Sequence, residues 1–257
     1  MAGELNLFLE TARTHFDEDI RRAFDLRDHA VGLVAGRLKD DLLRSAWTIS
    51  VGAADAFYCD AYADLVSRTL RAKSLQPSGR LPDRLGNLRI PVVAVLNSTN
   101  SWQWRMAARE LIEKESVLSI KEIKTLLNLF CRERHKLLTK DTIESWLVHT
   151  DARQRHFGMT RTAYNATAGV LRDRAKRTAL EKFGKRIQIL FQRRHDCIHN
   201  CDRPRLAIQR INSNATTKAI EDIRFLVERS CEHLRNEYPL YLAGREFTAI
   251  TRNRVGA

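Results

Sequence analysis

The sequence predicts an all-α protein, and three observations favour this fold class. Turn-forming residues are scarce, with 11 Gly and 5 Pro in 257 residues, whereas proteins of many short strands need frequent turns. Apolar residues recur at three- and four-residue steps, the spacing of one helix face. Hydrophobic residues make up 44% of the chain, enough for a sizeable core. We therefore expect one helical domain over residues 1–257, an up-and-down bundle with an inserted helical segment.

Three helices are expected in the first third of the chain. A short amphipathic helix is predicted over about 3–15. A second helix begins near Asp17, where acidic residues suit the positive end of the helix dipole, and ends at about Leu38. A third helix over about 40–73 carries small residues at helical spacing, so a neighbouring helix can pack closely against it.

The middle of the chain, about 88–178, is expected to form the inserted helical segment. Ser119 with Glu122, and Asp141 with Glu144, each match the capping box at the start of a helix. The helices of this segment are expected at about 100–115, 120–135 and 141–150.

Two long helices complete the expected bundle, at about 179–201 and 216–238. A connection separates them, because Pro204 disfavours helical backbone at the residue before it. The core helices are therefore expected within about 17–73 and 179–238.

The charge of the chain indicates a polyanionic partner. The net charge is +13 and the pI is near 9.9, which attracts polyanions at long range. Arginine outnumbers lysine, and its guanidinium binds phosphate through two parallel hydrogen bonds and stacks on bases. We therefore expect nucleic acid as the partner.

The N-terminus and the cysteines indicate a cytoplasmic protein. The first residues lack the basic and apolar regions of a secretory signal. No apolar run approaches the roughly 20 residues that span a bilayer. The five cysteines show no disulfide spacing. We expect reduced thiols, a cytoplasmic location and no membrane partner.

One position breaks the apolar pattern of the predicted helix at about 179–201. Arg194 falls in the middle of the apolar face, and Ile198 is expected to resume that face. A sequence that breaks its own pattern often does so at a functional site. His199 follows near the expected helix end, where the helix dipole favours a protonated imidazole.

An arginine and a histidine are the minimum set for cleaving RNA without a metal. Imidazole ordinarily titrates near neutrality, so it can take the proton of a ribose 2′-hydroxyl. A guanidinium stabilises the charge that develops on the phosphorus in the transition state. A second histidine would supply the acid that protonates the leaving group.

The stretch RRHDCIHN, residues 193–200, resembles the Arg-x(4–6)-His motif of the HEPN superfamily. These are all-α ribonucleases of toxin, CRISPR and phage-defence systems. Four residues separate Arg194 from His199 and five separate Arg193 from it, so the spacing does not choose between the two arginines. The upstream stretch AADAFYCDAYADLV, residues 53–66, is similar to a helix of small residues with embedded Asp in the RiboL-PSP-type HEPN branch.

The resemblance implies a metal-independent endoribonuclease that leaves 2′,3′-cyclic phosphate ends and uses no cofactor. It also implies a toxin or phage-defence effector that forms a homodimer. Two motifs would face each other across one cleft, with His199 contributed by each subunit. The expected partners are RNA, the second subunit and a cognate antitoxin or regulatory protein.

The resemblance assigns a role to each residue of the motif. Arg194 stabilises the scissile phosphate, His199 is the general acid or base, and His195 orients or assists it. Asp60 or Asp55 is expected to hold Arg194, because a buried charge needs a partner of opposite sign.

The basic stretch before the motif is expected to place positive charge beside the cleft. We expect RNA-backbone contacts from Arg193, Lys185 and Arg186. Asn200, next to the catalytic histidine, is expected to support it.

A non-catalytic interpretation stays open beside the ribonuclease. A loose Arg-x(4–6)-His pattern arises by chance in a chain so rich in arginine, and His29 with Arg22 also satisfies it. A HEPN-like module without catalysis would bind RNA or DNA through its basic surface.

A zinc site is the rival chemistry. His195 with His199, and Cys197 with Cys201, are each four residues apart and could face one way on a helix. Residues 195 and 197 point to opposite sides of a helix, however, so one tetrahedral site cannot take all four ligands.

Overall fold

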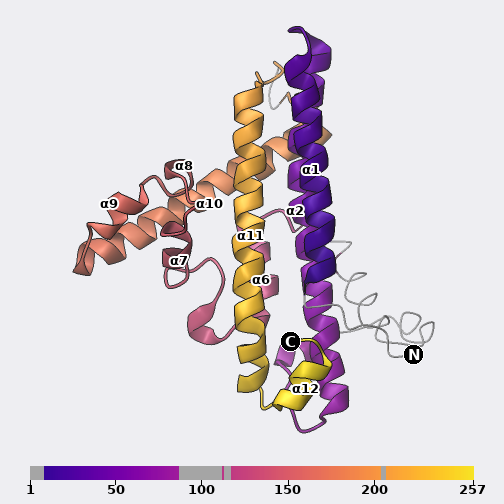
Figure 1. The fold of residues 1–257 in the computed structure, drawn as a ribbon, viewed down its shortest axis with the longest axis vertical. Helices are drawn as coiled ribbons and strands as arrows, with labels where there is room; N and C mark the ends of the chain where they lie inside the picture. The colour runs from indigo at the N-terminus through magenta and orange to yellow at the C-terminus, as the bar shows by residue number, and fades with distance from the viewer. Residues whose placement is uncertain (1–8, 87–111, 113–116, 204–206) are drawn as a thin grey trace, which may run out of the picture. The chain divides into compact units, whose positions relative to one another are not determined.

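In the computed structural model the described residues form helices and no strand (Figure 1). The description covers residues 9–86, 112, 117–203 and 207–257. The all-α prediction is therefore confirmed over these ranges. The helix expected at about 100–115 lies outside them except for residue 112. No helix in this part of the chain is long and apolar enough to cross a membrane.

The chain divides into two compact units. Unit 1 comprises residues 1–14, 56–137 and 230–257, and unit 2 comprises residues 15–55 and 138–229. The segment expected as one insert is shared between the two units. Three long helices also contribute residues to both: α1 (Glu10–Gly32), α2 (Arg37–Leu75) and α11 (Ser213–Gly244).

The first helix is continuous where two helices were expected. α1 extends from Glu10 to Gly32, so the predicted start near residue 17 is wrong, and the helix ends before Leu38. No Gly or Pro interrupts the chain near residue 17, so nothing ends the helix there. The acidic residues 17–19 lie inside the helix, where Asp19 pairs with Arg22 one turn later, at 2.7 Å between Oδ1 and Nη1.

α2 confirms the long helix expected at about 40–73. Its small residues Ala46, Ala53 and Ala61 are buried, as their helical spacing predicts. A side chain of one carbon leaves space for neighbouring residues to approach the helix backbone closely.

Unit 1 contains α6 (Ile120–Leu127), whose predicted start is confirmed. Ser119 Oγ accepts a hydrogen bond from the backbone N–H of Glu122 at 3.0 Å. The helix ends at Leu127 rather than near 135, because the Asn128 side chain hydrogen-bonds both backbone groups of Leu137 and turns the chain. Short helices complete the unit: η1 (Asn128–Phe130), η2 (Glu133–His135), α12 (Ala249–Arg254) and α3 (Asp83–Gly86).

The core of unit 1 is aromatic. Phe130 is fully buried and makes edge-to-face contacts with three tyrosine rings, at centroid separations of 5.9–6.4 Å. These tyrosines are Tyr62, Tyr238 and Tyr241. The hydroxyl of Tyr238 lies 3.0 Å from Thr69 Oγ1, so this buried polar group keeps a partner.

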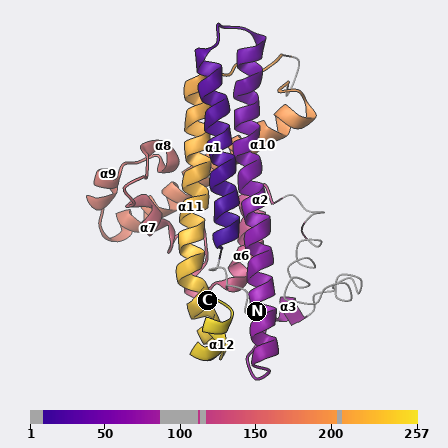
Figure 2. The ribbon, with the colours of Figure 1, turned by 45° about the vertical axis from the view of Figure 1, so that its right-hand side comes forward.

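Unit 2 groups three short helices on the first half of a long one (Figure 2). The short helices are α7 (Ile143–Leu147), α8 (Gln154–Phe157) and α9 (Arg161–Asn165), and the long helix is α10 (Gly169–His199). α10 begins about ten residues earlier than predicted. Its end at His199 agrees with the expected helix end.

The start predicted at Asp141 is wrong, because Thr142 is the N-cap residue of α7. Glu144 does not complete a capping box there. Its carboxylate instead pairs with Arg172 at 2.7 Å and with Lys176 at 2.5 Å, both on α10. These ion pairs, with the hydrogen bond from Lys176 first, lower the pKa of Glu144 to about 2. The glutamate therefore ties α7 to α10.

Candidate active site at the end of α10

The last two turns of α10 carry the predicted catalytic histidines on the surface of unit 2. His195 and His199 are both exposed and one helical turn apart. Their ring centroids lie 4.5 Å from each other, as side chains at i and i+4 do. Asn200 is exposed and forms the C-cap of the helix.

A tight turn stops the helix directly after His199. The backbone N–H groups of Asn200 and Asp202 both donate to the carbonyl oxygen of Asp196, each at 2.9 Å. Cys201 and Asp202 are in the left-handed region, with φ of 47° and 57°. Such backbone costs about 1–2 kcal/mol for a residue with a Cβ. Contacts made by this turn must offset that cost.

Asp202 supplies such a contact. Its carboxylate is fully buried, and Oδ2 accepts from Arg44 Nε on α2 at 2.7 Å and from Arg193 Nη2 on α10 at 3.0 Å. We call Arg44, Arg193 and Asp202 the Asp202 clamp. Burial alone would lower the pKa of Arg44, but the hydrogen bond and charge of Asp202 outweigh it and raise that pKa above its ordinary value.

Arg193 has further contacts inside unit 2. Its Nη2 also donates to the carbonyl oxygen of Arg210 at 3.0 Å, and its guanidinium lies 5.0 Å over the ring of Trp47. The indole N–H of Trp47 donates to the carbonyl oxygen of Leu190 at 3.2 Å, which fixes the ring. Only 13% of the Arg193 side chain is exposed. Its guanidinium is thus committed to the protein, although an RNA contact was expected of it.

Arg194 differs from its neighbour. It is half-buried and makes no ion pair among the described residues, although its Nε, like that of Arg193, is buried without a hydrogen-bond partner. Five residues at 100° each place it about 140° around the helix axis from His199. Ile198 is 46% exposed, so the expectation that it resumes the apolar face is wrong. The helix ends one residue later, and its last turn is not covered on that side by described residues.

The residues expected to support Arg194 lie on α2. Asp55 is half-buried in the part of α2 that belongs to unit 2. Asp60 is buried in the part that belongs to unit 1. Their role in holding Arg194 stays a prediction.

The other two expected RNA contacts, Lys185 and Arg186, have different surroundings. Lys185 is exposed on α10. Arg186 pairs with Asp222 of α11 at 2.6 Å between Nε and Oδ2, so its charge is largely neutralised within unit 2. Lys185 is therefore the freer of the two for a phosphate.

Sequence reasoning missed the network around Asp222. This carboxylate is fully buried and also accepts from Arg155 Nε at 2.7 Å and from His156 Nε2 at 2.8 Å. Burial alone would raise the pKa of Asp222, but the hydrogen bond from His156 and the charge and hydrogen bond of Arg186 outweigh it and lower that pKa. The signal was an Asp inside the apolar stripe of the helix expected at about 216–238, between Ile220 and Ile223.

His156 is a structural histidine. Its ring is buried, and Nδ1 accepts from the backbone N–H of Arg153 at 3.2 Å. Nε2 must therefore carry the hydrogen that is donated to Asp222. Both ring nitrogens are used, which leaves none for proton transfer to a substrate.

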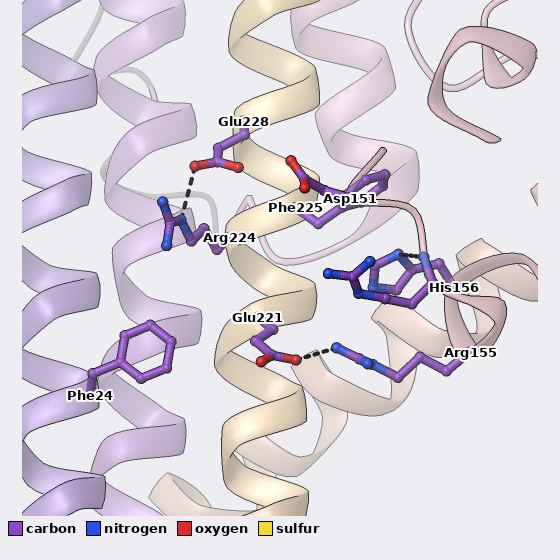
Figure 3. Close-up of a pocket in the computed structure, with 9 residues that line it drawn as sticks. Phe24, Asp151, Arg155, His156, Glu221, Arg224, Phe225 and Glu228 are labelled. Atoms are coloured by element: carbon purple, nitrogen blue, oxygen red, sulfur yellow. Dashed lines mark hydrogen bonds and ion pairs between the residues drawn. The ribbon is translucent and has the colours of Figure 1, made fainter. Parts of the chain in front are cut away.

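A polar pocket of about 290 Å³ lies beside this network in unit 2 (Figure 3). Four of its charged side chains pair with one another, since Arg155 contacts Glu221 at 2.5 Å and Arg224 contacts Glu228 at 2.9 Å. Asp151 and Arg153 add one negative and one positive charge to the lining. The pocket therefore offers no excess of cationic charge for a phosphate.

The zinc alternative finds no ligand cluster in the described part of the chain. No group of three or more His, Cys, Asp or Glu residues there is arranged to hold a metal ion. Cys201 is exposed, whereas Cys197 is half-buried and burial raises the pKa of its thiol. Burial thus disfavours the thiolate that a metal would need at Cys197.

No protein-family model matches the chain, no curated protein matches it, and no solved structure matches it.

Proposed function

We propose that this protein is a metal-independent endoribonuclease of the HEPN type, a toxin or phage-defence effector that acts on RNA. The observation that carries the proposal is the contrast between two adjacent arginines. Arg193 is held inside unit 2 by Asp202 and Trp47. Arg194 makes no such ion pair among the described residues and lies five positions before the exposed His199. This contrast favours Arg194 as the catalytic arginine.

The reaction uses only groups that the chain can supply. An imidazole takes the proton of a ribose 2′-hydroxyl, and the oxygen attacks the adjacent phosphorus. The new P–O2′ bond forms as the P–O5′ bond breaks, and a second imidazole protonates the leaving 5′-oxygen. Arg194 stabilises the charge on the phosphoryl oxygens. The products are a 2′,3′-cyclic phosphate and a 5′-hydroxyl, and no water or metal is consumed.

Two sources can supply the second imidazole. His195 lies 4.5 Å from His199 in the same chain, measured between ring centroids. A homodimer would instead bring His199 of a second copy to the cleft. The wide angle between Arg194 and His199 around α10 favours the homodimer, because one phosphate then meets groups from both chains.

The test replaces the two central residues. Arg194→Ala is expected to lower cleavage about 10²–10³-fold. His199→Ala is expected to lower it about 10²–10⁴-fold. His199 is exposed and Arg194 makes no ion pair among the described residues, so the far-UV circular dichroism spectrum and melting temperature should stay close to those of the wild type. Cleavage is followed on a fluorescent RNA in buffer that contains EDTA.

Two exposed residues on helices serve as matched controls. His29→Ala removes the histidine of the chance motif on α1, and Arg174→Ala removes an exposed arginine of α10. Both should cleave at the wild-type rate. His195→Ala distinguishes the two sources of the second imidazole. If both imidazoles come from one chain, this variant should lose as much cleavage as His199→Ala does. Wild-type cleavage by Arg194→Ala and His199→Ala would contradict the proposal, as would loss of cleavage in EDTA.

A second function is favoured by the charge of α10. This helix carries nine basic and three acidic residues, and Lys182 and Lys185 are exposed on it. A non-catalytic module would use this charge to bind RNA or DNA. Tight binding by the wild type without cleavage of any RNA would favour this function over the ribonuclease.

A further inference from the structure

The buried carboxylate of Asp202 has no part in the proposed chemistry, yet it lies three residues after His199. Its two arginine partners come from different places in the chain. Arg44 belongs to α2, 158 residues away, and Arg193 immediately precedes Arg194. The ion pair between residues 193 and 202 therefore encloses the whole segment that holds Arg194 and His199.

Hydrogen bonds also connect the segment 193–202 to the backbone of residues 209 and 210. The carbonyl oxygen of Asp202 accepts from the N–H of Gln209 at 2.9 Å. Arg44 Nη2 and Arg193 Nη2 donate to the carbonyl oxygens of Gln209 and Arg210, each at 3.0 Å. The chain that returns from the end of α10 is thus tied to both arginines of the clamp.

The left-handed backbone of residue 202 indicates that the aspartate side chain is required at this position. Glycine would adopt the left-handed conformation of residue 202 most easily. An aspartate stands there instead, with φ of 57° and a fully buried carboxylate. The carboxylate holds two arginines that would otherwise repel each other inside unit 2.

We propose that the Asp202 clamp is a positioning device that sets the end of α10, and with it the place of His199 relative to Arg194. This inference rests on the proposed function for its catalytic consequence. Because Asp202 is fully buried, it acts through the rotation of α10 at residue 193 and through the position at which the helix stops. A displacement of about 1 Å at catalytic groups can cost about 10²-fold in rate.

The test variant is Asp202→Asn. Asparagine tolerates left-handed backbone, so this change removes the charge of residue 202 while the turn can keep its conformation. We expect kcat for RNA cleavage to fall about 10²-fold, with KM changed less than about threefold. Hydrogen exchange at residues 196–203 should become faster. Arg44→Lys, which keeps the charge but loses the planar fork, should show a smaller fall in kcat if Asp202→Asn fails to fold.

The matched control is Asp41→Asn. Asp41 also pairs with Arg44, at 3.1 Å, but its side chain is 70% exposed and distant in sequence from α10. This variant should keep wild-type kcat and hydrogen exchange. The clamp is overturned if Asp202→Asn cleaves at the wild-type rate, or if KM rises while kcat stays constant.

The hydrogen-exchange measurement separates failure of the clamp from failure of the proposed function. If the wild type cleaves no RNA, faster exchange at residues 196–203 in Asp202→Asn alone still supports the clamp as the device that orders this segment. Unchanged exchange in that variant overturns it. If the wild type cleaves RNA and Asp202→Asn behaves like it, the ribonuclease stands and the clamp does not.

Discussion

At the scale of single residues, the choice between two neighbouring arginines is decided by what each guanidinium touches. Arg193 contacts Asp202, Trp47 and the Arg210 carbonyl, which together form a buried polar site. Arg194 is half-buried and makes no ion pair among the described residues. A single peptide bond thus separates a structural arginine from the candidate catalytic one.

The turn after His199 yields a prediction at this scale. Cys201 is exposed and has φ of 47°, so its side chain contributes little packing while its backbone is unfavourable. Cys201→Asn should stabilise the protein by about 0.5–1 kcal/mol, because asparagine tolerates this region better. Urea unfolding of the reduced protein measures the change. Cys201→Ala keeps the Cβ and gains no local hydrogen bond, so it should not stabilise.

At the scale of helices, buried carboxylates join elements that are far apart in sequence. Asp222 on α11 receives Arg155 and His156 from α8 and Arg186 from α10. Glu144 does the same between α7 and α10, nearer the surface. Unit 2 therefore uses charge as well as its aromatic core of Trp146, Phe157, Phe183 and Phe225 to hold its short helices.

The network at Asp222 predicts a dependence of stability on pH. Asp222→Asn should destabilise unit 2 by about 3 kcal/mol at pH 7, since it removes the buried carboxylate that the half-buried Arg155 and Arg186 share. The pKa of Asp222 is lower when folded than when unfolded. Its contribution is therefore full above the unfolded value, near 4, and is lost as pH falls through the folded pKa.

Urea unfolding at pH 7 and in steps below pH 4 measures this contribution. The difference between wild type and Asp222→Asn should shrink as the pH falls. Asp173→Asn is the control, because Asp173 pairs with Arg177 at 3.0 Å on the surface of α10. It should change stability by less than about 1 kcal/mol at either pH. If the difference in unfolding free energy between wild type and Asp222→Asn is the same at all pH values, the pKa of Asp222 is not lowered by folding.

At the scale of the whole molecule, only part of the 44 lysines and arginines is available to a partner. Arg44 and Arg193 pair with the buried carboxylate of Asp202, and Arg186 pairs with that of Asp222, all within unit 2. The exposed lysines Lys182 and Lys185 have no acidic partner among the described residues. RNA binding should therefore depend on a subset of the basic residues rather than on the total charge.

Salt dependence tests that subset. The logarithm of the binding constant for single-stranded RNA should fall linearly with the logarithm of salt concentration. Lys182→Ala and Lys185→Ala should each reduce the magnitude of this slope by about 0.7, the value for one phosphate contact on a single strand. Arg80→Ala is the control, because Arg80 is 71% exposed but pairs with Glu246 in unit 1. If Arg80→Ala reduces the slope as much as the lysine variants do, RNA binding depends on the overall positive charge of the protein rather than on Lys182 and Lys185.

The sequence by itself determined the features that depend on near neighbours. Helical spacing and scarce turn residues predicted the all-α class, the extent of α2 and the end of α10 at His199. Ser119 predicted the start of α6, since a cap acts over three residues. The hydrogen bonds that form a helix connect residues four apart, so the local sequence carries this information.

Only the tertiary structure decided which charged side chains are engaged and which are free. Arg44 and Asp202 are 158 residues apart, and Arg155 and Asp222 are 67 apart, so no spacing in the sequence relates them. The same holds for Arg193 over Trp47 and for the exposure of Ile198. A buried charge is stable only beside its partner, and that partner is brought near by packing, which depends on the whole chain at once.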